Sequence, residues 1–149
     1  MILIKRTNSN DSDFHVLVEE LDKTFTAIYG DVQLEYDQYN IIENIDTVVI
    51  AYTNNEPVGC GCFKNFNVNA VELKRMFVAA DCRGKGIGAA ILYELESWAV
   101  ELGNSTIVLE TGTKQTEAIH LYQKMGYQSI PNYGQYIGMK YSICMKKEL

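Results

Sequence analysis

The spacing of apolar and polar residues along the first third of the chain predicts a strand and then a helix. The opening residues, MILIKR, alternate as in a half-buried strand. Polar cap residues follow, and then Phe14, Leu17, Val18 and Leu21 recur at the i, i+3, i+4, i+7 spacing of an amphipathic helix. Residues 24–45 have no clear period, and we expect a second short helix within loops there.

Three successive strands are predicted next, as a meander. DTVVIAYTNNEPVGCGCFKNF, residues 46–66, predicts two strands joined at Asn54 and Asn55. Asparagine tolerates the positive φ that tight hairpin turns require. The third strand is AVELKRMFV, residues 70–78.

The second half of the chain predicts helices alternating with strands. From Ile87 the apolar residues recur at helical spacing up to Leu102, and Gly103 provides a stop. A buried-type strand, a short helix and two closing strands follow: STIVLET (105–111), TEAIHLYQKM (116–125), YQSI (127–130) and YSICMKKE (141–148). The pattern predicts a mixed α/β fold, in which a mostly antiparallel sheet has a strand–loop–helix–strand unit at its centre. We expect one domain over residues 1–149.

The net charge of the protein limits the kinds of molecule that it is expected to bind. The net charge is −6 and no Lys/Arg run exceeds two residues, which argues against nucleic acid or an anionic membrane as a partner. The same charge is compatible with a cationic small molecule.

Neither a signal peptide nor a run of about 18 apolar residues is present, so we expect a cytoplasmic protein.

The cysteines and histidines do not suggest a metal site. Cys60 and Cys62 are two residues apart, which on a strand points both thiols to one face, whereas Cys82 and Cys144 stand alone. Only two histidines are present, and they lie far apart. We therefore expect reduced thiols and no metal.

The stretch CRGKGIGAA, residues 82–90, carries the main chemical signal. It lies between a predicted strand and the start of a helix, where the first main-chain amides have no internal partners and attract anions. Glycines at 84, 86 and 88 let a ligand approach the backbone, and Arg83 and Lys85 add positive charge. The loop predicts a phosphate or pyrophosphate ligand, and a simple flexible turn is the alternative.

A dinucleotide is a competing ligand for this loop. GKGIGA also fits the G-x-G-x-x-A pattern, and Glu110 ends the next strand about where a ribose-binding acid would lie. Against this, AADCR separates the loop from its strand, and that strand carries Glu72, Lys74 and Arg75. Only 39 residues follow Glu110, which is too few for the remaining strand–helix units.

The run from Arg83 to Gly88 resembles the [QR]-x-x-G-x-[GA] acyl-coenzyme A signature of the GNAT N-acetyltransferase superfamily. VELKRMFV before it and EAIHLYQKMGY after it are similar to the flanking blocks of that family, and the resemblance covers residues 47–127 well. It implies an acetyltransferase that uses acetyl-coenzyme A (acetyl-CoA), with the loop holding the pyrophosphate and the preceding strand pairing with the pantetheine arm. The implied cofactor-binding residues are Met76, Phe77, Val78, Arg83, Gly84, Lys85, Gly86, Ile87, Gly88 and Ala89.

The resemblance also implies two catalytic residues. Glu72 lies eleven residues before Arg83, the offset at which some members place a general base, with Glu110 as the alternative base. Tyr122 occupies the inward stripe of its helix and corresponds to a tyrosine that points at the thioester sulfur. The structural alternatives are a surface ion pair for Glu72 and an aromatic core position for Tyr122. Many relatives have asparagine just before this helix, where this chain has Gln115, which puts side-chain contacts to pantetheine there in doubt.

For the acceptor we expect a small amine such as an amino acid, a polyamine or a drug-like amine. Segment 29–44 mixes tyrosines with acidic residues, a composition suited to binding an ammonium ion, and IPNYGQYIGMKY (130–141) adds Tyr133, Tyr136 and Tyr141. The candidate substrate-binding residues are Tyr36, Glu110 and Tyr133. A non-catalytic acyl-CoA sensor is the alternative function. The sequence leaves open a homodimer.

Overall fold

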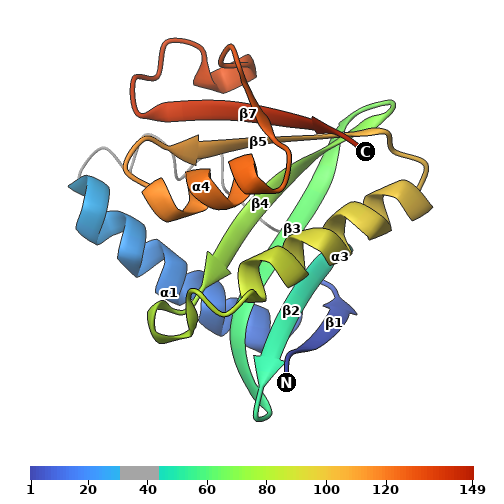
Figure 1. Cartoon of the computed structure of the whole chain (residues 1–149), viewed down its shortest axis with the longest axis vertical. Helices are drawn as coiled ribbons and strands as arrows, with labels where there is room; N and C mark the ends of the chain where they lie inside the picture. The colour runs from blue at the N-terminus through green and yellow to red at the C-terminus, as the bar shows by residue number, and fades with distance from the viewer. Residues whose placement is uncertain (31–43) are drawn as a thin grey trace. The chain divides into compact units, whose positions relative to one another are not determined.

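The computed structural model describes residues 1–30 and 44–149. Tyr36 lies outside these described residues. Figure 1 shows a sheet with helices connecting its strands. The elements in chain order are β1 (Leu3–Thr7), α1 (Ser12–Tyr29), β2 (Val48–Thr53), β3 (Glu56–Asn67), β4 (Ala70–Val78), the 3-10 turn η2 (Ala80–Cys82), α3 (Ile87–Glu101), β5 (Thr106–Gly112), α4 (Thr116–Lys124), β6 (Gln128–Ile130), the 3-10 turn η3 (Gly134–Tyr136) and β7 (Ser142–Glu148).

The strands form a seven-stranded sheet in the order β1-β2-β3-β4-β5-β7-β6. The pairs β1–β2, β2–β3, β5–β7 and β6–β7 are antiparallel. The pair β4–β5 is parallel, because helix α3 connects these two strands. The predicted mixed α/β fold with a mostly antiparallel sheet is confirmed. This topology differs from the doubly wound parallel sheet that a dinucleotide-binding fold requires.

The described residues fall into two compact units that share β3, β4 and α3. The first unit comprises Met1–Phe63 and Lys74–Leu95, and the second comprises Lys64–Leu73 and Glu96–Leu149. Residues 31–43 of the first unit are not described. None of the helices in the described ranges is both long and apolar enough to cross a bilayer.

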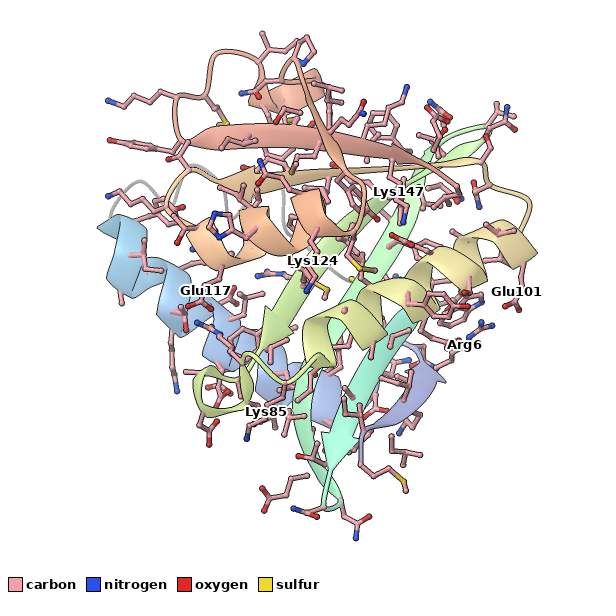
Figure 2. All side chains as sticks on the ribbon, in the orientation of Figure 1. Arg6, Lys85, Glu101, Glu117, Lys124 and Lys147 are labelled. Atoms are coloured by element: carbon pink, nitrogen blue, oxygen red, sulfur yellow. The ribbon has the colours of Figure 1, made fainter. Side chains whose placement is uncertain are left out.

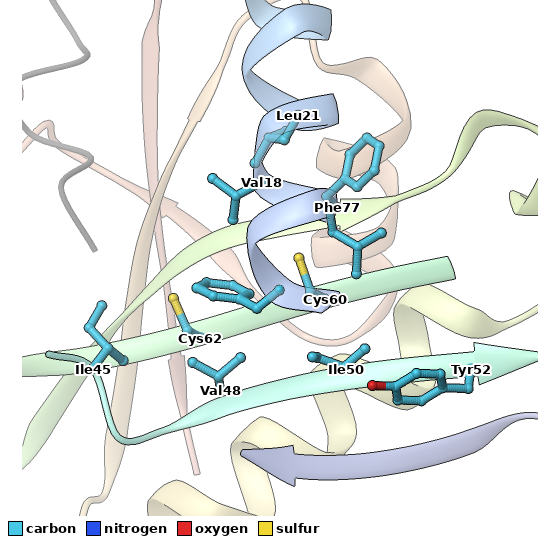
Figure 3. Packing of buried hydrophobic residues seen from close by; sticks show 11 residues of the cluster. Val18, Leu21, Ile45, Val48, Ile50, Tyr52, Cys60, Cys62 and Phe77 are labelled. Atoms are coloured by element: carbon cyan, nitrogen blue, oxygen red, sulfur yellow. The ribbon is translucent and has the colours of Figure 1, made fainter. Parts of the chain in front are cut away.

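The two faces of β3 explain how the first unit packs. Cys60 and Cys62 are fully buried on the face turned toward α1, within an apolar cluster (Figure 3). Gly59 and Gly61 alternate with them and face α3. A Cβ at Gly59 would lie 2.8 Å from Ile91 Cδ1, and one at Gly61 would lie 2.9 Å from Leu95 Cδ1. The alternation of cysteine and glycine therefore fills one face and lets a helix approach the other closely.

Helix α1 continues further than the sequence pattern predicted. It runs to Tyr29, and Gly30 caps its end with φ 59° while its N–H bonds to the carbonyl of Thr26. Threonines at 24 and 26 weaken the helical pattern in sequence because they are β-branched. In the fold each hydroxyl instead bonds to the carbonyl four residues earlier.

Candidate active site

The glycine loop of the first unit joins β4 to α3. Gly84 and Gly86 adopt φ values of 76° and 82°, in the left-handed region that favours glycine. A Cβ at either position would meet nothing within 4 Å. The glycines are thus required by backbone conformation, and space is open beside both of them.

The start of helix α3 provides donors for an anion. The amide of Ala90 donates to the carbonyl of Gly86 at 3.1 Å, which closes the first helical turn. The amides of Ile87, Gly88 and Ala89 precede that bond and so lie in the turn where amides have no acceptor within the helix. They carry the positive end of the helix dipole. Lys85, exposed in the loop, adds a cation beside them (Figure 2).

Two predicted cofactor residues have a structural role in the same unit. Arg83 Nε donates to the carbonyl of Val78 at 3.0 Å, which holds this arginine against the end of β4. Ile87 is 1% exposed and packs over β3, close to Gly59. Any contact of Ile87 with a ligand is therefore confined to its main chain.

Strand β4 has an irregular backbone just before Met76. Arg75 has a φ of 55°, which is unusual for a residue with a side chain and interrupts the regular alternation of the strand. Its guanidinium forms an ion pair with Asp22 of α1. Beyond this point Phe77 is buried in the apolar cluster, whereas Met76 and Val78 are half-buried.

Glu72 is the most deeply buried acid of the second unit. Its side chain accepts a 2.6 Å hydrogen bond from the hydroxyl of Tyr133, and Lys64 Nζ lies 3.9 Å from its other oxygen. The residue is only 3% exposed. The alternative interpretation of Glu72 as a surface charge is therefore wrong.

Aromatic rings surround the tyrosine that holds this carboxylate. Tyr133 packs edge-on against Phe66 and Tyr136, with ring centroids 5.0 and 5.7 Å apart. Burial raises the pKa of Tyr133, and its hydrogen bond to Glu72 raises it further. The hydroxyl therefore stays protonated and remains a donor to the acid. The loop that carries the two tyrosines is held by Asn132, whose Nδ2 lies 3.1–3.3 Å from three of its carbonyls.

Glu110 lies on the same face of the sheet as Glu72. In the parallel pairing Glu72 is opposite Val108, and Glu110 follows Val108 by two residues, so all three side chains point to one face. Ser142 Oγ donates to Glu110 at 2.7 Å. The structure thus places the two candidate bases, Glu72 and Glu110, on neighbouring strands.

Tyr122 lies on the buried side of α4, as its helical position predicted, and is 4% exposed. Burial raises the pKa of its hydroxyl well above the ordinary value, and the charge of Glu110 acts in the same direction. Tyr122 is therefore a neutral hydrogen-bond donor at physiological pH. His120, two residues earlier, is exposed.

Three residues of this region were not identified from the sequence. They are Phe66, Asn132 and Ser142, which hold or flank Glu110 and Tyr133. The segment IPNYGQYIGMKY was recognised only for its tyrosines. An asparagine followed by a tyrosine and a glycine turn was the one local sign that this loop is ordered.

The four cysteines form no disulfide, and the residues that the structure describes hold no candidate metal cluster. All four cysteines are free, and three of them are buried: Cys60, Cys62 and Cys144. Burial raises the pKa of Cys60, so this thiol is a poor nucleophile. In the part of the chain that the structure describes, no group of three His, Cys, Asp or Glu side chains could hold a metal ion.

Comparison with known proteins defines the class to which this fold and loop belong. The sequence profile of the acetyltransferase (GNAT) family matches residues 14–127. The chain belongs to this family and is a GNAT-type N-acetyltransferase, as its loop and flanking blocks predicted.

Individual relatives agree with this assignment. The chain is 32% identical over 135 residues to an IAA acetyltransferase of Azospirillum brasilense, covering 89% of this chain and 88% of that protein. Among solved structures, it is similar to a Klebsiella pneumoniae protein provisionally described as an acyl-CoA N-acyltransferase. The TM-score is 0.83 at 28% identity, covering 100% of this chain and 98% of the other. The PaiA N-acetyltransferase of Thermoplasma acidophilum, solved with coenzyme A, shares the fold with a TM-score of 0.74 at 19% identity, covering 100% and 99% of the two chains.

Proposed function

We propose that this protein transfers the acetyl group of acetyl-CoA to a primary amine of a small molecule, by direct attack in a ternary complex. We further propose that residues 1–149 act as one N-acetyltransferase domain. The extent of the family match and the sharing of β3, β4 and α3 by both compact units support this. Glu72 carries the proposal, because it is a buried acid held by a tyrosine in a family whose reaction needs a base.

The glycine loop fits the cofactor. A diphosphate needs several converging donors and an approach without side chains, and the loop provides both. Gly84 and Gly86 leave open space, the first turn of α3 supplies amides, and Lys85 adds charge. We assign Arg83–Ala89 to the pyrophosphate, and the backbone of Met76, Phe77 and Val78 to the pantetheine arm.

The reaction requires a neutral amine. An amine with a pKa of about 10.4 is unprotonated in only about one molecule in 2,500 at pH 7, which corresponds to about 4.6 kcal/mol. In the proposal Glu72 receives the ammonium proton, directly or through a water. The freed nitrogen pair then forms the C–N bond while the C–S bond breaks, and the nitrogen gives up its second proton to the departing thiolate, which leaves as the thiol. Glu110 is the alternative base.

In the proposal Tyr122 interacts with the sulfur atom that leaves with coenzyme A. Acetyl-CoA supplies the acetyl group as a thioester, and the C–S bond electrons leave with the sulfur. Full proton transfer from a tyrosine of pKa about 10 to a thiolate of pKa about 8.5 is uphill by roughly 2 kcal/mol. The raised pKa of Tyr122 makes that transfer harder still. We therefore assign Tyr122 a hydrogen bond to the sulfur.

The acceptor is proposed to carry its amine as an ammonium ion. Two carboxylates, Glu72 and Glu110, share one face of the sheet, and the faces of aromatic rings attract cations. Tyr133 contributes both a ring and the hydroxyl that holds Glu72. The proposed role of Tyr36 concerns a residue outside the described part of the chain.

The proposal is tested with purified protein, acetyl-CoA and a panel of amines, with thiol release as the readout. The panel should include amino acids, linear polyamines and aromatic amines, each beside its N-acetylated or uncharged analogue. We expect turnover with at least one cationic amine and none with its uncharged analogue. Coenzyme A binding without turnover for every amine would contradict the transfer and favour the acyl-CoA sensor. A thermal-shift panel that responds to NAD and not to coenzyme A would contradict the cofactor assignment.

A further inference from the structure

Glu96 of α3 is a buried acid in the second unit, with no part in the proposed chemistry. It is 8% exposed and has two close partners. The hydroxyl of Tyr127 donates to Glu96 Oε2 at 2.8 Å, and Lys147 Nζ lies 2.9 Å from Oε1. Lys147 also lies 5.7 Å from the centroid of the Tyr127 ring. Figure 2 labels Lys147 on β7. These three side chains, here called the Tyr127 anchor, come from three different segments.

The anchor is unusual because it places charge where apolar packing would suffice. Its neighbours on α3, Leu92, Leu95 and Ala99, are all fully buried. Pairing a buried acid with a cation is often no more stabilising than packing apolar residues, because Glu96 loses its hydration, whereas Lys147, with 24% of its side chain exposed, keeps part of its own. Stability alone is therefore a weak reason for the anchor, whereas holding one ring in a fixed place is a sufficient reason.

Tyr127 contacts Tyr122 in two ways, through a main-chain hydrogen bond and through its ring. Its main-chain N–H donates to the carbonyl of Tyr122 at 2.9 Å, and the two rings lie with centroids 5.6 Å apart at 58°. Gly126 makes the chain reversal between them, with a φ of 98°. One side of the Tyr127 ring thus contacts Tyr122, and its hydroxyl is fixed at the far end by Glu96.

We propose that the Tyr127 anchor is a positioning device for Tyr122: Glu96 and Lys147 fix the ring of Tyr127, and that ring fixes the direction of the Tyr122 hydroxyl. This inference rests on the proposed role of Tyr122 at the sulfur. A tyrosine ring reorients through two torsions, and a displacement of about 1 Å in a reacting group can lower a rate 100-fold. Burial raises the pKa of Tyr127, as does the nearby charge of Glu96, so its hydroxyl stays protonated as a donor.

Tyr127→Phe is the sharpest test in the intact protein, because it removes one hydroxyl and keeps the ring. We expect kcat to fall at least fivefold, while the dissociation constant for coenzyme A changes less than twofold. In a Tyr122→Phe background the same substitution should change kcat less than twofold, because no hydroxyl remains to be positioned. An equal loss in both backgrounds would show a merely structural role and overturn the inference. No loss in the wild-type background would overturn it as well.

A second measurement does not depend on activity. With 3-fluorotyrosine incorporated at position 122, the fluorine resonance should be single and sharp in the otherwise wild-type protein. It should shift or broaden in both Tyr127→Phe and Glu96→Gln. Tyr93→Phe, an exposed tyrosine of α3, and Lys146→Met, an exposed lysine of β7, are the matched controls and should leave the resonance unchanged.

The two readouts separate this inference from the proposed function. An unchanged resonance in both anchor variants overturns the anchor, even if the enzyme is active. An enzyme without turnover on any amine, but with a resonance that responds to both anchor variants, contradicts the proposed reaction and leaves the positioning of Tyr122 supported.

Discussion

The hydroxyl of Tyr133 donates a hydrogen bond of 2.6 Å to the carboxylate of Glu72, although 61 residues separate them in sequence. One oxygen of the candidate base is thereby held by a neutral donor. Its other oxygen lies 3.9 Å from Lys64 Nζ, a distance at which the charges attract but no short hydrogen bond forms. We propose that an acceptor ammonium approaches this carboxylate, which Tyr133 orients.

Glu72→Gln should lower kcat by 100- to 10,000-fold at pH 7, the range typical for loss of a general base. Glutamine keeps the volume and still accepts the hydrogen bond from Tyr133, so the loss would report chemistry. The variant can use only amine that is already neutral. Its rate should therefore rise about tenfold per pH unit below the pKa of the amine, and the gap to the wild type should narrow.

Glu148→Gln is the matched control for this experiment, because Glu148 is an exposed acid of the same unit that pairs with Lys146. It should have wild-type kcat over the whole pH range. A pH-independent ratio between Glu72→Gln and the wild type would count against Glu72 as the base and favour Glu110.

Replacing Tyr133 separates its ring from its hydroxyl. Tyr133→Ala removes the edge-on contacts with Phe66 and Tyr136 and the ring face, so KM for a cationic amine should rise roughly 3- to 30-fold. Tyr133→Phe keeps the ring and should leave this KM within about threefold. Initial rates at saturating acetyl-CoA provide the comparison. Equal KM values for the two variants would show that the ring does not bind the cation.

The parts of this site that follow local rules could be predicted from sequence. The inward position of Tyr122 follows from helical spacing, and the glycine loop from its place between a strand and a helix. At Asn54 and Asn55, positive φ values of 52° and 66° confirm the predicted hairpin. Each of these features depends on a few neighbouring residues.

The parts that depend on contacts between distant segments could not be predicted. The hydrogen bond from Ser142 to Glu110 joins β7 to β5, which are far apart in sequence and pair only in the folded chain. No local sequence pattern at either residue indicates the other as its partner. The positive φ of Arg75 could not be predicted from the sequence either, because AVELKRMFV has the composition of an ordinary strand. Such a conformation is set by the partners of the strand and not by its own residues.

Gly61→Ala should destabilise the protein by about 1–3 kcal/mol, the usual cost of overpacking. Its Cβ would lie 2.9 Å from Leu95 Cδ1 and 3.0 Å from Met76 Sδ, so α3 or these side chains must move. Urea denaturation measures the loss. The double variant with Leu95→Val should lose less stability than the sum of the two single variants, because the shorter side chain gives back space. Additive losses would indicate that crowding against Leu95 is not the cause.

We expect Asp11, at the start of α1, to make a pH-dependent contribution to the stability of the folded protein. Partial burial acts to raise the pKa of Asp11, but hydrogen bonds from Lys5, the Asp13 amide and Thr7 outweigh it, so the pKa lies below the ordinary 3.8. A lowered pKa stabilises the fold when the carboxyl is charged, and this stabilisation is lost as the pH falls through that pKa.

Asp11→Asn tests this contribution, because asparagine caps a helix about as well as aspartate. The wild type should be more stable than this variant at neutral pH, and the difference should begin to fall near pH 3.8 and shrink further as the pH drops through the lower pKa of the folded state. Asp11→Ala also loses the cap, which costs about 1 kcal/mol, so it should remain less stable at every pH. Urea denaturation of the three proteins between pH 3 and 7 gives the comparison. A difference between wild type and Asp11→Asn that does not shrink between pH 4 and pH 3 would contradict the assignment.

Gly86→Ala should weaken coenzyme A binding about tenfold. An alanine strains the backbone at a φ of 82° and relaxes by turning the loop amides away from their present directions. Gly103→Ala is a closely matched control, because Gly103 has a φ of 92°, also has open space around it, and lies beyond the other end of α3. Both variants should lose about 1–2 kcal/mol of stability, but only Gly86→Ala should raise the dissociation constant measured by calorimetry. If the two variants bound coenzyme A equally well, the backbone of this loop would not be the pyrophosphate site, and the assignment of Arg83–Ala89 would have to be abandoned.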